Sequence, residues 1–385
     1  MQIVSRTVVL MAVIVAGDYG AKHDSVRAFS QAFGPHVPVH FSRPTLQWQI
    51  WSPTSRVTHV EMKIDSQTVD AKYDDDQRSI VYTPGEPLSV GPHHVECKAT
   101  FDAKATFAKN WDTSVAPDAV AKLADPTDLQ KQLLALSNAK RKQLGLPEMA
   151  IDARLDAAAN AHAAYLAANK LVGHEEQPNC PGFVGLTGGE RCESFGWCSG
   201  SWEGVTYGES TLSEAVNNLF DAPYHRVPFL QPGPTLFGSS SADSRTTLLF
   251  GSSQAAGVTV SPADGAVDSP VQWECHEDPN PLRGHTDKNL SGYPIVVAAF
   301  GLGADKLQVP TATLQTTAGE NVDLWVQTSA NDEFLTNAAI LIPQKPLQPS
   351  TTYTASVQLV YGDKSETKTW KFTTAKALPP NSRAR

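Results

Sequence analysis

The sequence has little positive charge. Its 385 residues include 31 Lys and Arg against 40 Asp and Glu, which gives a formal net charge of −9 at pH 7. The only basic run is Lys140-Arg141-Lys142, and a solvated helix face explains it. Proteins that bind nucleic acid or anionic membrane surfaces carry a basic patch or stripe. The composition therefore argues against both as partners.

The sequence also lacks an apolar run that could span a bilayer, which takes about 20 residues. The apolar run near the N-terminus, Val8 to Ala16, follows a single Arg6 and precedes small residues. A basic start, a short apolar core and small residues are the three parts of an export signal. We predict that residues 1–21 are a signal peptide and that the protein is secreted or held at the cell surface. A buried N-terminal strand is the alternative.

Cysteine is sparse but clustered. There are five, at Cys97, Cys180, Cys192, Cys198 and Cys275. Disulfides persist in exported proteins, and three cysteines within one short segment predict a local disulfide there. A zinc knuckle is the rival interpretation, although Cys192-x5-Cys198 lacks the two close cysteine pairs that are typical of such a site.

Motifs of nucleophilic and nucleotide-dependent enzymes are missing. The sequence contains no Gly-x-Ser-x-Gly, no His-Glu-x-x-His and no Gly-rich phosphate loop before a helix. Nothing in the residues therefore strengthens an enzymatic function.

Two long stretches have the pattern of short strands. Residues 37–116 and 257–377 contain alternating apolar and polar runs separated by Gly, Pro and Asp turns, and Tyr353 to Tyr361 alternates most clearly. This pattern predicts a β-sandwich in each stretch. The second stretch also resembles the bacterial Ig-like domains that end in a Trp-x-Phe-Thr-Thr strand, here Trp370 to Thr374.

The two stretches share a possible repeat. Four residues recur 259 positions later: Pro84, Pro87, Leu88 and Trp111 correspond to Pro343, Pro346, Leu347 and Trp370. At that displacement, however, the apolar Val95 meets the polar Thr354. If both stretches are sandwiches, the inward phase of one strand must be shifted by a residue.

Residues 125–255, between the two stretches, have helical patterns. Thr127-Asp128 can start a helix that Gly145 ends. A second helix is indicated by Leu155, Ala159, His162 and Leu166, which fall on one face. Thr211-x-x-Glu214 is a capping box that starts a third helix, which we expect to extend to about Asp221.

Five short motifs in this middle stretch carry a family resemblance through their order along the chain. They are Asn138-x-x-Arg141, Ala159-x-x-His162-Ala-x-Tyr165, the loop residue His174, Gly208-Glu209, and Pro223-Tyr224-His225-Arg226. Over roughly Pro126 to Ser253 the chain resembles the CAP superfamily (cysteine-rich secretory, antigen 5 and pathogenesis-related proteins), within its bacterial branch. The resemblance implies an α-β-α sandwich, with 236–238 and 246–250 as strands. The predicted fold class is therefore α+β and multidomain, a central CAP-like domain flanked by two Ig-like β-sandwiches.

The candidate site residues are His174, Glu209 and His225. Two imidazoles and a carboxylate can hold a divalent, zinc-like metal and leave a position open for water or ligand. Only the resemblance implies that they converge, since the cleft of the family carries two His and two Glu. Otherwise, His174 is a loop residue, Glu209 solvates a turn, and His225 suits the dipole of a helix end.

Three neighbouring residues have competing interpretations. The second cleft glutamate of the family lies on the helix before the last histidine, where only Glu214 is available, and capping explains Glu214 equally well. His162 falls on the packed helix face, so we expect a hydrogen-bonded core residue there. Arg226 could pair with a carboxylate or bind an anion.

The functional prediction is a secreted, non-enzymatic binding module whose cleft takes an extracellular ligand such as a lipid, a cell-wall component or a protein. A metal-dependent hydrolase that uses the same cleft is the first alternative, because an open coordination position can activate water. A purely structural surface protein is the second alternative.

Overall fold

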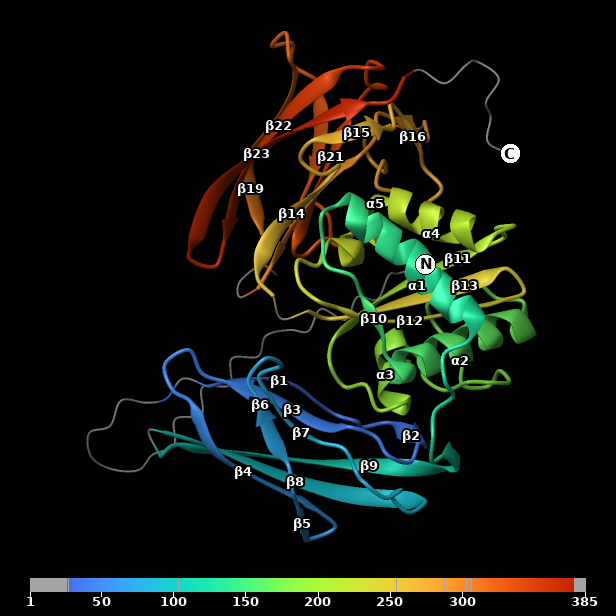
Figure 1. Cartoon of the computed structure of the whole chain (residues 1–385), viewed down its shortest axis with the longest axis vertical. Coiled ribbons are helices and arrows are strands. Elements are labelled where there is room, and N and C mark those ends of the chain that lie inside the picture. The colour runs from blue at the N-terminus through green and yellow to red at the C-terminus, as the bar shows by residue number, and fades with distance from the viewer. Residues whose placement is uncertain are drawn as a thin grey trace.

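The computed structural model describes residues 26–376 except 27, 103, 254, 287, 302–303 and 305–306. The predicted signal peptide lies outside the described residues. The described chain is of mixed α/β class, with its helices gathered between two β-rich parts (Figure 1). We call the three parts the N-terminal unit (28–120), the central unit (128–251) and the C-terminal unit (257–374). Within the described residues, none of the helices has both the length and the apolar character that crossing a membrane requires.

The N-terminal unit contains two sheets, with strand orders β1-β3-β7-β6 and β2-β9-β8-β4-β5. Residues from both sheets, among them Trp48, Ile80, Met62 and Val95, share one buried cluster. Buried and exposed residues alternate along β8, as expected for a strand with one face in a core. The strands are β1 (Phe29–Gly34), β2 (Pro38–Phe41), β3 (Leu46–Trp51), β4 (Val57–Ile64), β5 (Gln67–Val69), β6 (Lys72–Asp74), β7 (Ser79–Tyr82), β8 (Gly91–Phe101) and β9 (Thr106–Val120).

The C-terminal unit also contains two large sheets, ordered β14-β18-β21-β20 and β15-β23-β22-β19, with a small β16-β17 pair beside them. Its strands are β14 (Gly257–Ser261), β15 (Ala266–Ser269), β16 (Trp273–Glu274), β17 (Leu290–Ser291), β18 (Ile295–Phe300), β19 (Gln308–Thr316), β20 (Leu324–Gln327), β21 (Ala338–Pro343), β22 (Thr352–Tyr361) and β23 (Lys364–Thr374). Val297, Val357 and Trp370 lie in a cluster that joins the two sheets.

Strands β18 and β21 are buried along their whole length, which explains their uninterrupted apolar sequences. Val297 faces the core of the C-terminal unit. The neighbouring Val296 packs in a second cluster with Tyr224 and Leu230 of the central unit. The C-terminal and central units therefore share a hydrophobic interface.

The phase shift expected for the repeat is present. Trp111 lies opposite Val95 in the β8–β9 hairpin, whereas Trp370 lies opposite Ala355 in the β22–β23 hairpin. Trp370 lies 259 positions after Trp111, the displacement of the repeat. Ala355 follows Val95 by one position more than that. Each partner is fully buried. The one-residue shift therefore keeps an apolar side chain beside each tryptophan.

The central unit is a four-stranded sheet, ordered β10-β12-β13-β11, with helices on both faces. Its elements are α1 (Asp128–Gln143), β10 (Ala150–Ile151), α2 (Ala153–Asn169), α3 (Gly188–Ser194), β11 (Ser201–Tyr207), α4 (Leu212–Asp221), α5 (Pro223–Arg226), a 3-10 turn (Val227–Leu230), β12 (Leu236–Ala242) and β13 (Arg245–Gly251). The predicted strands at 236–238 and 246–250 are confirmed as β12 and β13.

Alternation along β13 shows which helices cover which face. Leu248 and Phe250 pack with residues of α1 and α4, whereas Leu249 packs with Leu155 of α2 and Cys192 of α3. The alanine-rich face of α2 lies very close to the sheet. A Cβ atom on Gly238 would stand 2.1 Å from the backbone carbon of Leu155, so only glycine fits there.

The predicted helix signals are confirmed. All four residues of the predicted α2 face are fully buried: Leu155, Ala159, His162 and Leu166. Thr211 and Glu214 form the capping box of α4. Helix α1 begins after the cap residue Thr127 and ends before Gly145.

The predicted local disulfide is wrong, because all five cysteines are free thiols. Cys192 packs among residues of α2 and touches Ser201, and burial raises the pKa of its thiol to about 12. The Cys198 sulfur instead lies against the Thr45 carbonyl of the N-terminal unit. The third thiol, Cys180, is half-buried beside Gln177. Each therefore faces a different neighbour.

Candidate functional site

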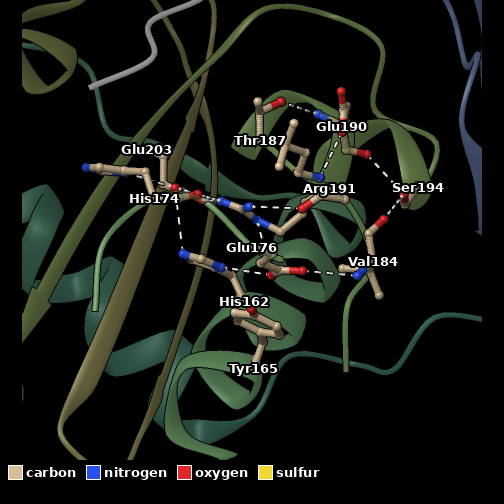
Figure 2. Close-up of polar contacts among 12 residues, drawn as sticks. His162, Tyr165, His174, Glu176, Val184, Thr187, Glu190, Arg191, Ser194 and Glu203 are labelled. Atoms are coloured by element: carbon tan, nitrogen blue, oxygen red, sulfur yellow. Dashed lines mark hydrogen bonds and ion pairs between the residues drawn. The ribbon is translucent and has the colours of Figure 1, made fainter. Parts of the chain in front are cut away.

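His174 lies in the loop after α2, and a buried histidine holds that loop. His162 Nδ1 is 2.9 Å from Glu176 Oε1 (Figure 2). Its Nε2 is 3.0 Å from the carbonyl of Gly173. Glu176 also accepts a hydrogen bond from the backbone N–H of Val184. His162 thus ties the two ends of the loop to α2. The expectation that it is a hydrogen-bonded core residue is confirmed.

Glu203 of β11 is the carboxylate that meets His174. Its Oε1 lies 2.9 Å from His174 Nδ1, and Arg191 of α3 donates to both of its oxygens at 2.8 and 2.7 Å (Figure 2). The same guanidinium donates to the backbone carbonyl of His174. Arg191 therefore fixes both the carboxylate and the backbone of the histidine that contacts it.

The environment of Glu203 favours its charged form. Burial by itself would raise the pKa of Glu203, but the positive field of Arg191, together with His162 and His174, outweighs burial and holds the pKa below its ordinary value. Glu203 is consequently a carboxylate at neutral pH, able to accept the Nδ1 hydrogen of His174.

His225 lies on the short helix α5, and its carboxylate partner comes from another unit. His225 Nδ1 is 2.6 Å from Oε1 of Glu277, whose side chain is completely buried. The same oxygen accepts the backbone N–H groups of Tyr224 and His225, each at 3.1 Å. Glu277 belongs to the segment between β16 and β17 of the C-terminal unit.

The two histidines approach β11 from opposite faces. β11 is an edge strand, and its adjacent residues Glu203 and Gly204 point to opposite sides. Glu203 contacts His174, whereas a Cβ on Gly204 would lie 3.7 Å from the His225 ring. The rings of His174 and His225 stack with centroids 6.1 Å apart and planes at 17°. Their side chains are 16% and 10% exposed, so this edge meets solvent.

Glu209, the third predicted site residue, contacts other groups. It accepts hydrogen bonds from Thr206 and Asn218, and no contact joins it to either histidine within the part of the chain that the structure describes. The carboxylate beside His174 is instead Glu203, which lies four residues before Tyr207, the last residue of β11. Glu214 accepts the N–H groups of Ser210 and Thr211, as its capping role requires.

Arg226 has neither of its two expected roles, pairing with a carboxylate or binding an anion. Its guanidinium is fully buried and donates to the carbonyls of Phe220, Asp221 and Pro294, and it lies over the Tyr293 ring. No carboxylate pairs with it among the described residues. Arg226 joins α4 and α5 to the C-terminal unit and is not available to an external anion.

Sequence reasoning missed Glu203, Arg191 and Glu277. The sequence around Glu203 shows only a single carboxylate within a strand, which is not a motif. The resemblance to the family pointed to Gly208-Glu209 instead. Arg191 had no signal beyond its place in the cysteine-bearing loop. Glu277 lies 52 positions from His225, beyond the expected end of the central domain at residue 255.

The geometry defines what the two rings can do. Each carboxylate accepts the hydrogen on Nδ1, which leaves a lone pair on Nε2 of each neutral ring. Such nitrogens can accept a hydrogen bond, take up a proton or hold a metal ion. No group of three or more His, Cys, Asp or Glu residues suited to a metal was found in the described residues. The predicted metal site of His174, Glu209 and His225 stays a prediction.

Residues 134–262 match the model of a known family, described as the cysteine-rich secretory protein family, CAP. These residues are a CAP domain. The match begins within α1, ends after β14, and includes His174, Glu203 and His225. No curated protein matches the chain.

Solved structures with similarity to this chain include two bacterial proteins. An extracellular protein containing an SCP domain from Bacillus anthracis is 14% identical, covers 58% of this chain and 81% of its own, and has a TM-score of 0.29. A cysteine-rich secretory protein from Staphylococcus aureus is 11% identical, with 58% and 82% covered and a TM-score of 0.24. These low scores add nothing to the family match.

Proposed function

We propose that the chain is a secreted or cell-surface binding protein whose CAP domain takes an extracellular ligand at His174 and His225. The observation that carries this proposal is the pair of stacked rings, each with its Nδ1 bonded to a buried carboxylate. Rings held in this way present Nε2 in a fixed direction at little cost in side-chain entropy, which favours binding.

Two further features support binding at this place. The outer edge of β11 pairs with no other strand in the described chain. Unpaired backbone groups of an edge strand can bond to an extended ligand such as a peptide. Arg191 neutralises Glu203 beside His174, so this carboxylate presents no unbalanced charge to an incoming polar group.

The proposed organisation has an export signal at residues 1–21, Ig-like β-sandwiches at 37–116 and 257–377, and an α-β-α sandwich at 125–255. Its support is the pairing of sheets through one core in each outer unit and the helices on both faces of the central sheet. In this arrangement the N-terminal unit serves as a spacer or a further contact surface.

The test uses two probes, purified peptidoglycan and phosphatidylglycerol vesicles, each sedimented with the full chain. We expect one probe to carry the wild type into the pellet and His225→Ala to bind at least about tenfold more weakly. His59→Ala, an exposed histidine on β4, is the matched control and should bind as the wild type does. Equal binding by wild type and His225→Ala would contradict the proposed site, and binding to neither probe would leave only a protein ligand.

The alternative is a metal-dependent hydrolase at the same place. It is favoured by the Nδ1–carboxylate contacts, because metal-ligating histidines are oriented in this way. His174 and His225 would hold the ion through Nε2, and the ion would supply activation of water. Hydrolysis of peptidoglycan or an ester that depends on added metal and disappears in His225→Ala would replace binding as the function.

A further inference from the structure

We propose that Glu277 is a positioning residue for His225, so that the C-terminal unit completes the ligand site of the CAP domain. This inference rests on the proposed function, because it names the group that orients one of the two rings. The central unit supplies both rings and Glu203, and the C-terminal unit supplies the fourth component.

The hydrogen-bond pattern at Glu277 assigns the tautomer of His225. Glu277 Oε1 accepts two backbone N–H groups, those of Tyr224 and His225, so this oxygen acts as an acceptor. Its third and shortest contact, 2.6 Å to His225 Nδ1, then requires the hydrogen to be on Nδ1. Nε2 of the neutral ring keeps its lone pair.

Burying the Glu277 carboxylate costs free energy unless the His225 ring donates a hydrogen bond to it. The Glu277 side chain has no exposed surface, and its Oε2 atom has no hydrogen-bond partner in the part of the chain that the structure describes. A buried carboxylate is unfavourable unless polar groups surround it. Glu203 has Arg191 beside it, whereas His225 is the only ionisable side chain that hydrogen-bonds to the Glu277 carboxylate among the described residues. The His225 ring is thus a principal partner of this carboxylate.

The segment that carries Glu277 is itself fixed. The N–H of Cys275 donates to the carbonyl of Asn289 at 2.7 Å, and Trp273 is buried in the interface cluster. Nearby, Tyr224 donates to Asp332 at 2.5 Å, and Arg283 donates to both Tyr224 and Asp332. These contacts hold the C-terminal unit against Tyr224, the residue before His225, and fix the segment from which Glu277 reaches the ring.

A purely structural role is the competing explanation, since Glu277 also accepts backbone N–H groups of α5. The two roles differ in their consequence for the ring. A capping residue alone would leave the tautomer of His225 free, whereas a positioning residue fixes it on Nδ1. The tautomer is therefore the decisive observable.

The experiment is long-range ¹H–¹⁵N NMR of the imidazole rings in the full chain labelled with ¹⁵N-histidine, with His225 assigned from His225→Gln. In the neutral ring of the wild type we expect the hydrogen on Nδ1. Glu277→Ala should move a large fraction to Nε2, and Glu277→Gln, which keeps an acceptor oxygen, should restore Nδ1. Glu274→Ala removes an exposed carboxylate of the same segment and should change nothing.

Three results would overturn the inference. One is a wild-type His225 with its hydrogen on Nε2, which needs no variant and stays decisive if Glu277→Ala does not fold. Another is a folded Glu277→Ala that keeps the wild-type tautomer. The last is an altered tautomer with binding of the peptidoglycan or vesicle probe unchanged, where we expect a loss of about tenfold. If neither probe binds the wild type but Glu277 sets the tautomer, peptidoglycan and lipid fail as ligands and the positioning role stands.

Discussion

Three buried glutamates around the paired histidines are stabilised in three different ways. Glu176 accepts from His162 and from a backbone N–H, Glu203 is paired with Arg191, and Glu277 holds His225. A buried carboxylate with a bidentate arginine depends strongly on that partner, because removing one member leaves an uncompensated charge. The residue-scale consequences therefore differ from one glutamate to the next.

Replacing Glu203 should be costly for stability. Glu203→Gln removes the hydrogen-bonded counter-charge of the buried Arg191, whose Nε keeps only a longer 3.7 Å contact with Glu176. We expect the free energy of unfolding to fall by about 3 kcal/mol at pH 7. Because the pKa of Glu203 is lowered in the folded protein, its stabilising contribution is present above the ordinary pKa of a glutamate and is lost as pH falls below it. Urea unfolding between pH 3 and 7 should thus show the wild type and variant converging in acid.

Glu209→Gln is the matched control for that experiment. Among the described residues, the hydrogen-bond partners of Glu209 are the neutral side chains of Thr206 and Asn218. The expected loss is therefore about 1 kcal/mol or less. A larger loss for Glu209→Gln than for Glu203→Gln would contradict the assignment of Glu203 as the central carboxylate.

Asp156 should behave in the opposite sense. Burial raises its pKa to about 6, above the ~3.9 of an unfolded chain. The folded protein then binds the proton more tightly, so this stabilising contribution is complete below about pH 4 and lost as pH rises through 6. Asp156→Asn cannot ionise and so does not lose this contribution. Its free energy of unfolding, measured relative to that of the wild type, should rise by about 1–2 kcal/mol between pH 4 and 7.

Thermal or urea unfolding across this pH range measures the effect. The expected gain is less than the full value of the shift, because Asp156 lies in the first turn of α2 and its charge also favours the helix dipole. Asp128→Asn, the same change at an exposed position in the first turn of α1, is the control. Equal pH dependence in wild type and Asp156→Asn would show that Asp156 titrates normally.

Metal binding can be tested directly on the histidines. Zinc binding requires a neutral imidazole, so affinity should weaken as pH falls below about 6.5. Calorimetric titration with Zn²⁺ should show weaker binding for His174→Ala and for His225→Ala, with His59→Ala unchanged. Zinc affinity equal in all four proteins would exclude the paired histidines as the zinc site.

At the scale of elements, α4 owes its start to a local signal and its position to packing. Thr211 and Glu214 bond reciprocally to backbone N–H groups at its N-terminus. Val216 and Leu219 of α4 pack in the cluster beneath the sheet. The helix leads directly into α5 and His225, so its start matters for the site as well.

We expect Thr211→Ala to lower the free energy of unfolding by about 1 kcal/mol, as is typical for loss of a capping side chain. Ser213→Ala, an exposed position in the first turn of the same helix, should change it by less than about 0.5 kcal/mol. Urea unfolding followed by circular dichroism gives both values. A Thr211→Ala variant as stable as the wild type would mean that water replaces the cap without cost.

At the scale of the whole molecule, the central and C-terminal units share a core. Tyr224, Val227 and Leu230 of the central unit pack with Val296 and Ile340 of β18 and β21. Arg226 is buried at the same place and donates to carbonyls of both units. Separating the units would expose this apolar surface and leave the arginine's partners unpaired.

The two units should consequently unfold together. Native-state hydrogen exchange should give amides of β13 and of β18 the same opening free energy. Arg226→Ala should lower both by about 3 kcal/mol, because it leaves several buried carbonyls without donors. Lys142→Ala, an exposed basic residue in the last turn of α1, is the control. A fall confined to one unit would show that they open independently.

Local features of this protein could be predicted from its sequence. The buried face of α2 and the start of α4 follow from apolar spacing and capping residues, which act within a few positions of the chain. The hairpin shift between Val95 and Ala355 was expected for the same reason, because side chains alternate along a strand. The strands β12 and β13 were implied by the family resemblance. His174 and His225 came from a family resemblance, not from spacing.

Tertiary structure alone decided the carboxylates and the thiols. Glu203 lies within β11, and Glu209 lies two residues after its last residue, Tyr207. The placement of α3 and of the loop after α2 brings Arg191 and His174 to Glu203. Glu277 reaches His225 because the C-terminal unit docks on α5. Likewise Cys192 and Cys198, close in sequence, face different units. Contacts between distant segments depend on how whole units pack, and no local pattern encodes that packing.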